Sequence, residues 1–278
     1  MWIEGLRRAT VSTGVALRVA FVGWGAMAQE AFRLLGDAPI EVVAVAVRPD
    51  SERPRGLPPE ASVITRTDEL ALTMPDVVAE AAGYESVGPW GRATLGVGAD
   101  FVVSSVAAFA DGALLEELQA MAVDHGAQIQ IQPGALGGVE ALAAASAMGI
   151  ETVEHRITKP PSAWRGTPAE ERCDLEDLDE PEAFFIGTAA DAASRFPKNA
   201  NVAMTTALAG IGPERTQIKL IADPMATENR HEITAVGAFG KLDFSVSSYP
   251  LSDNPKTSAM AALNLARCLL NRVKPLIV

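Results

Sequence analysis

The sequence predicts an α/β protein of two parts, an N-terminal doubly wound parallel sheet and a second, α+β domain with an open sheet. Three observations support this prediction. Short apolar runs alternate with amphipathic stretches as far as residue 133, a glycine-rich turn follows the first run, and longer half-polar strands come afterwards. Because parallel strands need a crossover between them, such alternation is typical of a parallel sheet covered by helices on both faces.

The first part contains four mainly apolar runs, which are typical of strands buried on both faces. They cover residues 17–22, 41–47, 76–82 and 101–106, with a short apolar segment at 62–64. Apolar residues at helical spacing predict the helices between them. These helices are expected at 26–35, near 68–72, at 86–98 and at 112–125.

After Pro133 the pattern changes to half-polar strands, as in a sheet with one solvated face. The predicted strands cover residues 151–159, 184–188, 215–222, 231–236 and 241–247, with helices at 189–195 and 200–209. An amphipathic stretch at 256–272 predicts a final helix that packs back on the first part. We therefore expect a first domain of residues 17–133, completed by residues 250–278, and a second domain of residues 134–249.

The composition argues against several classes of function. A formal net charge of −12 opposes binding to a nucleic-acid backbone or an anionic bilayer, so neither partner is expected. No run reaches the ~18 consecutive apolar residues of a membrane helix. Cys173 and Cys268 lack the spacing of a disulfide framework or a metal site, which fits a reducing cytosol. We expect a cytoplasmic protein that binds a small molecule and no metal.

A glycine motif follows the first predicted strand and opens the first predicted helix. The segment Gly23–Ala28 (GWGAMA) matches the pattern G-x-G-x-x-A. Gly23 permits a tight turn, Gly25 lets a pyrophosphate approach the backbone, and the helix N-terminus at Ala26 and Met27 supplies N–H donors. The motif in this context predicts a site for NAD or NADP. The alternative is a glycine turn in some other α/β fold.

The end of the second predicted strand bears on which dinucleotide is bound. An Asp or Glu normally stands there and binds the adenosine ribose of NAD. This sequence has Arg48 at that place, followed by Pro49 and Asp50. An arginine can stack on adenine or pair with a 2′-phosphate, so we expect NADP to be accepted, while Asp50 keeps NAD open. The simpler alternative is that Arg48 is a solvated loop residue.

Three histidines are candidates for proton transfer, because histidine titrates near neutral pH. His125 lies at a predicted helix end beside Gly126, where capping explains it. His155 lies within one predicted strand, and His231 begins another. The residues alone do not separate the three, and a structural role is the alternative for each.

Two loops offer groups for a carboxylate-bearing substrate. Lys159 opens a rigid segment in which cations accompany Trp164. Lys198 and Asn199 precede a predicted helix whose Asn201 could cap its first turn or offer its amide to a ligand. Lys159, Lys198 and Asn199 are therefore our substrate-binding candidates. Ordinary surface loops and a plain helix cap are the alternatives.

Further motifs accompany these residues in a fixed order along the chain. They are Ile131–Gly138, Lys159–Trp164, Gly166–Pro168, Phe196–Val202, Ile221–Pro224, Glu228–His231, Gly237–Gly240 and Asn254–Ser258. With the glycine motif, this series resembles the L-aspartate dehydrogenase family nearly to the C-terminus. The resemblance places the active-site histidine of the family's E-N-x-H motif at His231. It places nicotinamide-contacting positions of the family at Ala135 and Asn201.

The resemblance implies an N-terminal Rossmann domain, an α+β domain with a dimer-forming sheet, and use of NAD or NADP. It also implies that L-aspartate is oxidised to iminoaspartate, which hydrolyses to oxaloacetate and ammonia or feeds quinolinate and NAD synthesis. The resemblance also implies that the protein is a homodimer. It further implies that His231 is the acid or base of the reaction. A homoserine dehydrogenase or a dihydrodipicolinate reductase is an alternative, against which the E-N-x-H motif and the P-K-N-A-N loop argue. A non-catalytic NAD(P)-binding sensor, which needs no histidine, is another.

Two segments depart from the family's pattern. The sequence has Ala82-Gly83-Tyr84 where the family often shows A-G-H, and Ser105–Phe109 (SVAAF) where it often shows S-V-G-A-L. We therefore expect Tyr84, Ala107 and Phe109 to form a bulkier pocket wall that bears on substrate preference.

Overall fold

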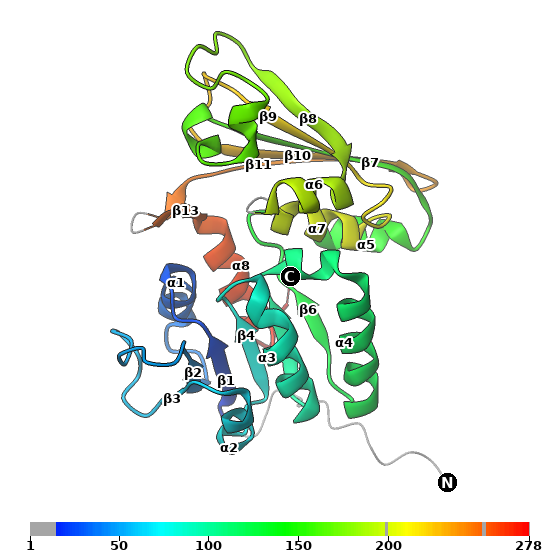
Figure 1. Ribbon diagram of the computed structural model, residues 1–278. Coiled ribbons are helices and arrows are strands. Elements are labelled where there is room, and N and C mark those ends of the chain that lie inside the picture. The colour runs from blue at the N-terminus through cyan, green and yellow to red at the C-terminus, as the bar shows by residue number, and fades with distance from the viewer. Residues whose placement is uncertain (1–14, 198–199, 252–253, 278) are drawn as a thin grey trace.

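The computed structural model describes residues 15–197, 200–251 and 254–277, which contain two main sheets (Figure 1). Within these residues the first sheet has six parallel strands in the order β3-β2-β1-β4-β5-β6. They are β1 (Leu17–Val22), β2 (Ile40–Ala46), β3 (Ser62–Ile64), β4 (Val77–Glu80), β5 (Asp100–Val103) and β6 (Ile129–Ile131). The predicted doubly wound parallel sheet is confirmed, and β6 extends it beyond the predicted strands.

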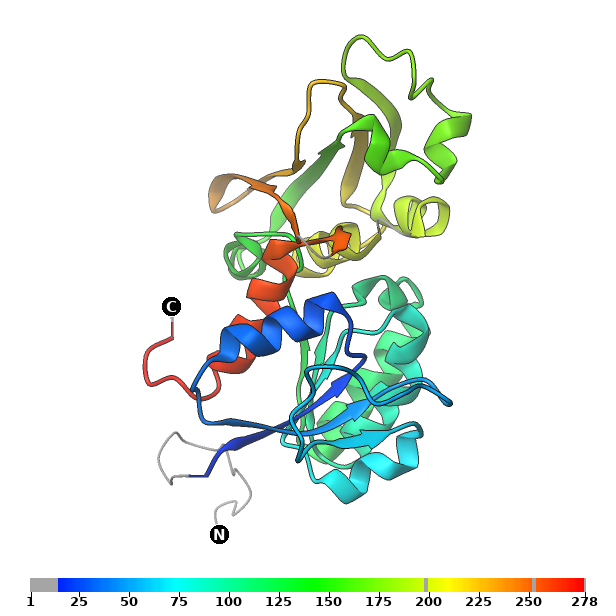
Figure 2. The ribbon, with the colours of Figure 1, turned by 90° about the vertical axis from the view of Figure 1, so that its left-hand side faces the viewer.

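Helices cover both faces of this sheet, because alternate side chains of each buried strand point to opposite sides. One face is covered by α1 (Ala26–Leu35) and α8 (Ala259–Leu270), and the other by α2 (Leu70–Thr73), α3 (Tyr84–Gly96) and α4 (Gly112–His125) (Figure 2). Val19 and Phe21 of β1 pack on the side of α1 and α8, whereas Ala20 and Val22 pack on the other side. The sheet thus separates two apolar clusters.

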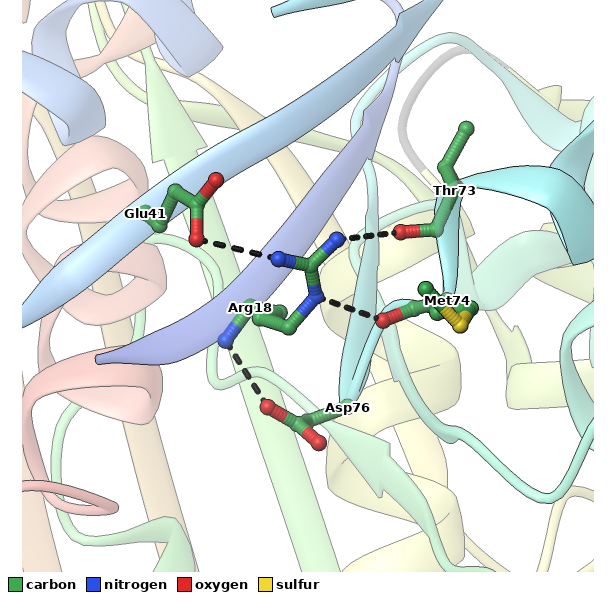
Figure 3. Close-up of polar contacts among 5 residues, drawn as sticks. All are labelled: Arg18, Glu41, Thr73, Met74 and Asp76. Carbon is green, nitrogen blue, oxygen red and sulfur yellow. Dashed lines mark hydrogen bonds and ion pairs between the residues drawn. The ribbon is translucent and has the colours of Figure 1, made fainter. Parts of the chain in front are cut away.

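Arg18 fastens the amino ends of neighbouring strands (Figure 3). Its guanidinium donates to the Glu41 carboxylate at 3.1 Å, and to the carbonyl oxygens of Thr73 and Met74 at 2.8 and 2.9 Å. Its backbone N–H donates to the Asp76 carboxylate at 2.8 Å. These contacts occupy the amino edge of the sheet, so a ligand site is expected at the opposite, carboxyl edge.

The second sheet, as far as the chain is described, has five strands in the order β11-β10-β7-β9-β8. They are β7 (Ile150–Lys159), β8 (Glu182–Thr188), β9 (Gln217–Ala222), β10 (Asn229–Gly237) and β11 (Gly240–Ser248). Between this sheet and the first lie α5 (Val139–Ser146), α6 (Ala189–Arg195) and α7 (Ala200–Ala209) (Figure 1). Glu154 and Arg156 of β7 are exposed on the opposite face. The expected α+β domain with an open sheet is confirmed.

Short elements complete the described chain. Single 3-10 turns are η1 (Thr67–Glu69), η2 (Val106–Ala110), η3 (Pro161–Trp164) and η4 (Pro168–Glu171), and a small hairpin pairs β12 (Pro250–Leu251) with β13 (Asn254–Ser258). The helix predicted at 256–272 begins later, at Ala259. The reason is a cap, since the Ser258 hydroxyl accepts a hydrogen bond from the Met260 N–H at 3.1 Å.

The last helix, α8, returns to the first domain. Its Leu265 and Leu269 are fully buried in the same cluster as α1. The Asn264 amide donates to the carbonyl oxygens of Gly134 and Leu136 at 2.8 and 3.0 Å. These bonds hold α8 against the connection between β6 and the second domain. No helix in the described part of the chain is long and apolar enough to cross a membrane.

Candidate active site

A cavity of about 340 Å³ lies where the carboxyl ends of β1, β4 and β5 face the second domain. Ligands of open parallel sheets bind at that edge. The lining comes from both domains: Gly25, Ala26, Met27, Ala81, Ala82, Gly83, Ser104, Ser105, Gln132, Gly134, Ala135, Lys159, Asn201, Val202, Asn229, His231, Ser258 and Ala261. Most of the site residues expected from the sequence are therefore brought together around one space.

The glycine turn is tightly packed at Gly23 and open at Gly25. Gly23 adopts φ of +87°, and a Cβ there would lie 2.9 Å from the Cα of Ala82, so glycine is required. A Cβ at Gly25 would meet nothing within 4 Å. No side chain caps α1 in the described structure, and its first turn has no acidic residue. The N–H groups at Ala26 and Met27 are thus available to an anion, which fits a dinucleotide pyrophosphate.

Arg48 lies near this turn but outside the cavity lining. The Gly23 N–H donates to the carbonyl oxygen of Ala46 at 2.9 Å, which places the end of β2 beside the glycine turn. Arg48 follows two residues later and is exposed, as is Asp50. This position is compatible with a contact to an adenosine ribose or its 2′-phosphate, and the role of Arg48 stays a prediction.

Glu80, which the sequence analysis did not single out, organises the loops after β4 and β5. It is fully buried. Its Oε1 accepts from the backbone N–H groups of Ala82 and Gly83 at 2.8 and 2.9 Å and from the Ser105 hydroxyl at 2.9 Å. Its Oε2 accepts from the Ser105 N–H at 2.8 Å. One carboxylate therefore holds both cavity-lining loops. The available signal was a single glutamate within an otherwise apolar run.

The expectation of a bulkier pocket wall is wrong, because none of the three residues lines the cavity. Phe109 is 2% exposed and packs into the apolar cluster of the first domain. Tyr84 begins α3 and is 61% exposed. The Ala107 backbone N–H donates to the Asn201 Oδ1 at 2.9 Å, so this position orients a cavity residue through the backbone.

The structure separates the three histidines. His125 is exposed at the end of α4, where Gly126 with φ of +66° forms the cap. His231, on β10, lines the cavity and is 4% exposed. His155, on β7, is fully buried behind it, with its Nε2 at 3.1 Å from the His231 Nδ1. Of the three, His231 alone borders the cavity.

Burial sets the charge state of the titratable groups that the second domain places at or behind the cavity surface. Burial, together with the positive charge of Lys159, lowers the pKa of His231 to about 3. Burial, and then the neighbouring His231, lowers the pKa of His155 well below its usual range. Burial also lowers the pKa of Lys159 to about 8. Near neutral pH the wall therefore presents a neutral imidazole beside a mostly protonated amine.

Lys159 ends β7 and lines the cavity, with its Nζ at 4.9 Å from the centre of the Trp164 ring. Trp164 is itself fully buried, and its indole N–H donates to the carbonyl oxygen of Ile221 at 3.0 Å. The ring is thus a fixed support for the lysine. Arg165 of the same loop is exposed and forms an ion pair with Glu176 at 3.7 Å. Only one of these two cations, Lys159, lines the cavity.

Two further predictions have different outcomes. Asn201, in the first turn of α7, and Ala135 line the cavity as expected. Because the Asn201 Oδ1 accepts from Ala107, its amide nitrogen is the end left for a ligand. Lys198 and Asn199 lie outside the described residues, so their substrate-binding role stays a prediction.

Fold and site together define a class. A glycine turn open to an anion faces a buried imidazole across one cavity, which is the arrangement of a Rossmann-type, NAD(P)-dependent oxidoreductase. Residues 140–272 match the family model described as aspartate dehydrogenase, C-terminal, and residues 23–132 match that described as homoserine dehydrogenase, NAD binding domain.

Curated relatives identify the family. The L-aspartate dehydrogenase of Brucella anthropi is 47% identical over 266 residues, which are 95% of this chain and 99% of the relative. That of Pseudomonas aeruginosa is 40% identical over 261 residues, which are 92% of this chain and 97% of the relative. The chain belongs to the L-aspartate dehydrogenase family.

Solved structures share the fold. The crystal structure of aspartate dehydrogenase from Thermotoga maritima has a TM-score of 0.73 at 22% identity and covers 94% of this chain and 99% of its own. A dihydrodipicolinate reductase from Paenisporosarcina has a TM-score of 0.53 at 17% identity and covers 93% of this chain and 95% of its own. These likenesses concern the fold alone.

Proposed function

We propose that this chain oxidises L-aspartate to iminoaspartate with NAD⁺ or NADP⁺, and that iminoaspartate is then hydrolysed to oxaloacetate and ammonia. The observation that carries the proposal is the shared cavity. His231 and Lys159 line the same space as the uncapped N-terminus of α1. A family member with this arrangement has the groups needed for binding, orientation and proton transfer in one place.

Both domains would hold the dinucleotide, the first at its pyrophosphate and the second at its nicotinamide end. Gly25, Ala26 and Met27 would bind its pyrophosphate, while Ala135 and Asn201 would flank the nicotinamide end. The bound nicotinamide supplies the hydride-acceptor chemistry. The protein's part is to hold the substrate Cα against it and to exclude water.

The second domain would bind and deprotonate the substrate. The protonated Lys159 amine would bind a substrate carboxylate, with Lys198 and Asn199 as further contacts. His231 would accept a proton from the substrate ammonium and release it to solvent before the second half of the reaction. It would then accept a proton from the water that attacks the imine and return that proton to the departing amine. A dicarboxylate that enters beside His231 brings negative charge, which raises the pKa of the imidazole and makes it a stronger base in the complex.

We further propose that the protein is a cytoplasmic homodimer that supplies iminoaspartate for NAD synthesis. The domain division that goes with this proposal is 17–133 with 250–278, and 134–249. The solvated face of the second sheet, with exposed Glu154 and Arg156, is the surface that we assign to the dimer. Light scattering on the purified protein tests the proposed homodimer, because a monomeric mass would contradict it.

Initial rates on the purified protein test the activity. Oxidation of L-aspartate with each dinucleotide, and reductive amination of oxaloacetate with ammonia, should both proceed. D-aspartate and L-homoserine are the controls and should react poorly. A protein that binds NADPH or NADH tightly yet turns over no amino acid would instead support a sensor, and preference for homoserine would support the related dehydrogenase.

A further inference from the structure

A chain of hydrogen bonds leads from the cavity into the second domain. The His231 Nδ1 lies 3.1 Å from the His155 Nε2, and the His155 Nδ1 lies 2.9 Å from the Thr206 hydroxyl. That hydroxyl in turn donates to the carbonyl oxygen of Val202 at 3.0 Å. His155 and Thr206 are fully buried and His231 is 4% exposed. The three side chains come from β10, β7 and α7, so only the folded domain assembles them.

The strand register explains why the two imidazoles meet. On the antiparallel pair β7 and β10, His155 is opposite Ile233, and His231 is opposite Ile157. The two histidines are therefore diagonal neighbours on one face. On their other sides they pair in register with Ile218 of β9 and Val246 of β11. Their cross-strand neighbours are apolar, which favours the imidazole–imidazole contact as the polar contact within the sheet.

The directions of the protons follow from the last acceptor. A carbonyl oxygen can only accept, so the single proton of the Thr206 hydroxyl points to Val202. The hydroxyl oxygen must then accept from His155, which places the His155 proton on Nδ1. Burial keeps both imidazoles neutral, so the His155 Nε2 is bare and accepts the proton on the His231 Nδ1. The His231 Nε2 is left unprotonated.

We infer that Thr206 and His155 are positioning residues that hold His231 in the Nδ1–H tautomer, with its Nε2 free to accept a proton from the substrate. This inference rests on the proposed function, in which His231 is the acid or base. The opposite tautomer would present an Nε2–H donor, which cannot take the proton of a substrate amine or a water. After His231 accepts that proton, the bare His155 Nε2 still accepts from its Nδ1–H, which stabilises the imidazolium.

The matched pair Thr206→Val and Thr206→Ser tests the hydroxyl. Valine keeps the volume but removes the acceptor, so His155 can carry its proton on Nε2 and force the wrong tautomer on His231. We expect kcat for L-aspartate to fall about 10- to 100-fold, by analogy with the loss of a hydrogen-bond partner that orients a metal-binding histidine. KM and the Kd for NADH should change little, and Thr206→Ser should recover most of kcat. Equal losses in both variants, with unchanged melting temperatures, would overturn the inference.

Side-chain ¹⁵N NMR of the histidines gives a second test that needs no turnover. The chain has three histidines, so a His125→Asn variant assigns the exposed one. In the wild type, His155 and His231 should both carry their proton on Nδ1, and Thr206→Val should shift protons to Nε2. A wild-type His231 with its proton on Nε2 contradicts the inference that Thr206 and His155 hold His231 in the Nδ1–H tautomer. An inactive protein that shows the predicted tautomers contradicts the proposed activity but supports the positioning of His231 by Thr206 and His155.

Discussion

The two walls of the cavity work by different physical means. In the wall from the first domain, Gly25 and the N-terminus of α1 offer backbone N–H groups, which do not titrate. In the wall from the second domain, His231 and Lys159 offer side chains whose pKa values are shifted by burial. The first wall depends on the absence of a side chain at Gly25, whereas the second depends on the side chains of His231 and Lys159. Binding and chemistry are thus separable by substitution.

The largest effect is expected in the second wall. His231→Ala should lower kcat about 10²- to 10⁴-fold, the usual range for loss of a general acid or base. The Kd for NADH should stay nearly constant, because the residue lies in the other wall. Steady-state kinetics with a fluorescence titration check both values. His125→Ala is the matched control, and a His231 variant that kept full kcat would remove the acid–base assignment.

The reverse pattern is expected in the first wall. Gly25→Val fills the space where a Cβ now meets nothing, at a φ of −80° that valine tolerates, so the chain should fold. We expect the Kd for NADH to rise at least about 100-fold, equivalent to two charge-assisted hydrogen bonds of about 1.5 kcal/mol each. Fluorescence titration measures it. Gly96→Val, at the exposed end of α3, should leave the Kd unchanged.

Lys159 should give the second wall a pH dependence that the first lacks. Its pKa is lowered to about 8, so the amine is charged below that pH and neutral above it. Inhibition by succinate, whose carboxylates do not titrate in this range, should weaken as pH rises through 8. Lys159→Met should weaken it about 10- to 100-fold at neutral pH and flatten the profile. Lys274→Met, exposed after the end of α8, is the control. An unchanged profile in Lys159→Met would place the carboxylate elsewhere.

The smallest effect is expected at the rim of the first wall. Arg48→Glu should raise the ratio of the Kd for NADPH to that for NADH about five- to tenfold, since a carboxylate repels a 2′-phosphate. The effect should shrink in high salt, because Arg48 is exposed. Paired titrations with both dinucleotides measure this ratio. A ratio that stayed the same would return Arg48 to the class of solvated loop residues.

Most of the fold could be predicted from the sequence, because buried parallel strands give continuous apolar runs and their helices give a clear period. The strand Ile129–Ile131 escaped prediction, since it has three residues, each half-buried. So did α5, whose alanines give little contrast between its faces. The start of the last helix was predicted three residues early, because the cap at Ser258 was not used as a stop signal.

The two walls differed in how far they could be predicted. The glycine turn is a local motif, and sequence spacing alone identified Gly25. The choice among the histidines depended on a resemblance, because burial of His155 behind His231 arises from two strands 76 residues apart. Glu80 acts on loops that a neighbouring strand brings to it, and no local pattern records that contact.

The return of α8 to the first domain also has a consequence for synthesis on the ribosome. Leu265 and Leu269 cover an apolar face of the first sheet together with α1. That face stays incomplete until α8 has left the ribosome, although the strands beneath it emerge earlier. A nascent chain that ends near residue 133 therefore exposes an apolar patch, and such a patch invites chaperone binding or aggregation. The synthesis of the nucleotide-binding domain therefore begins before that of the second domain and is completed after it.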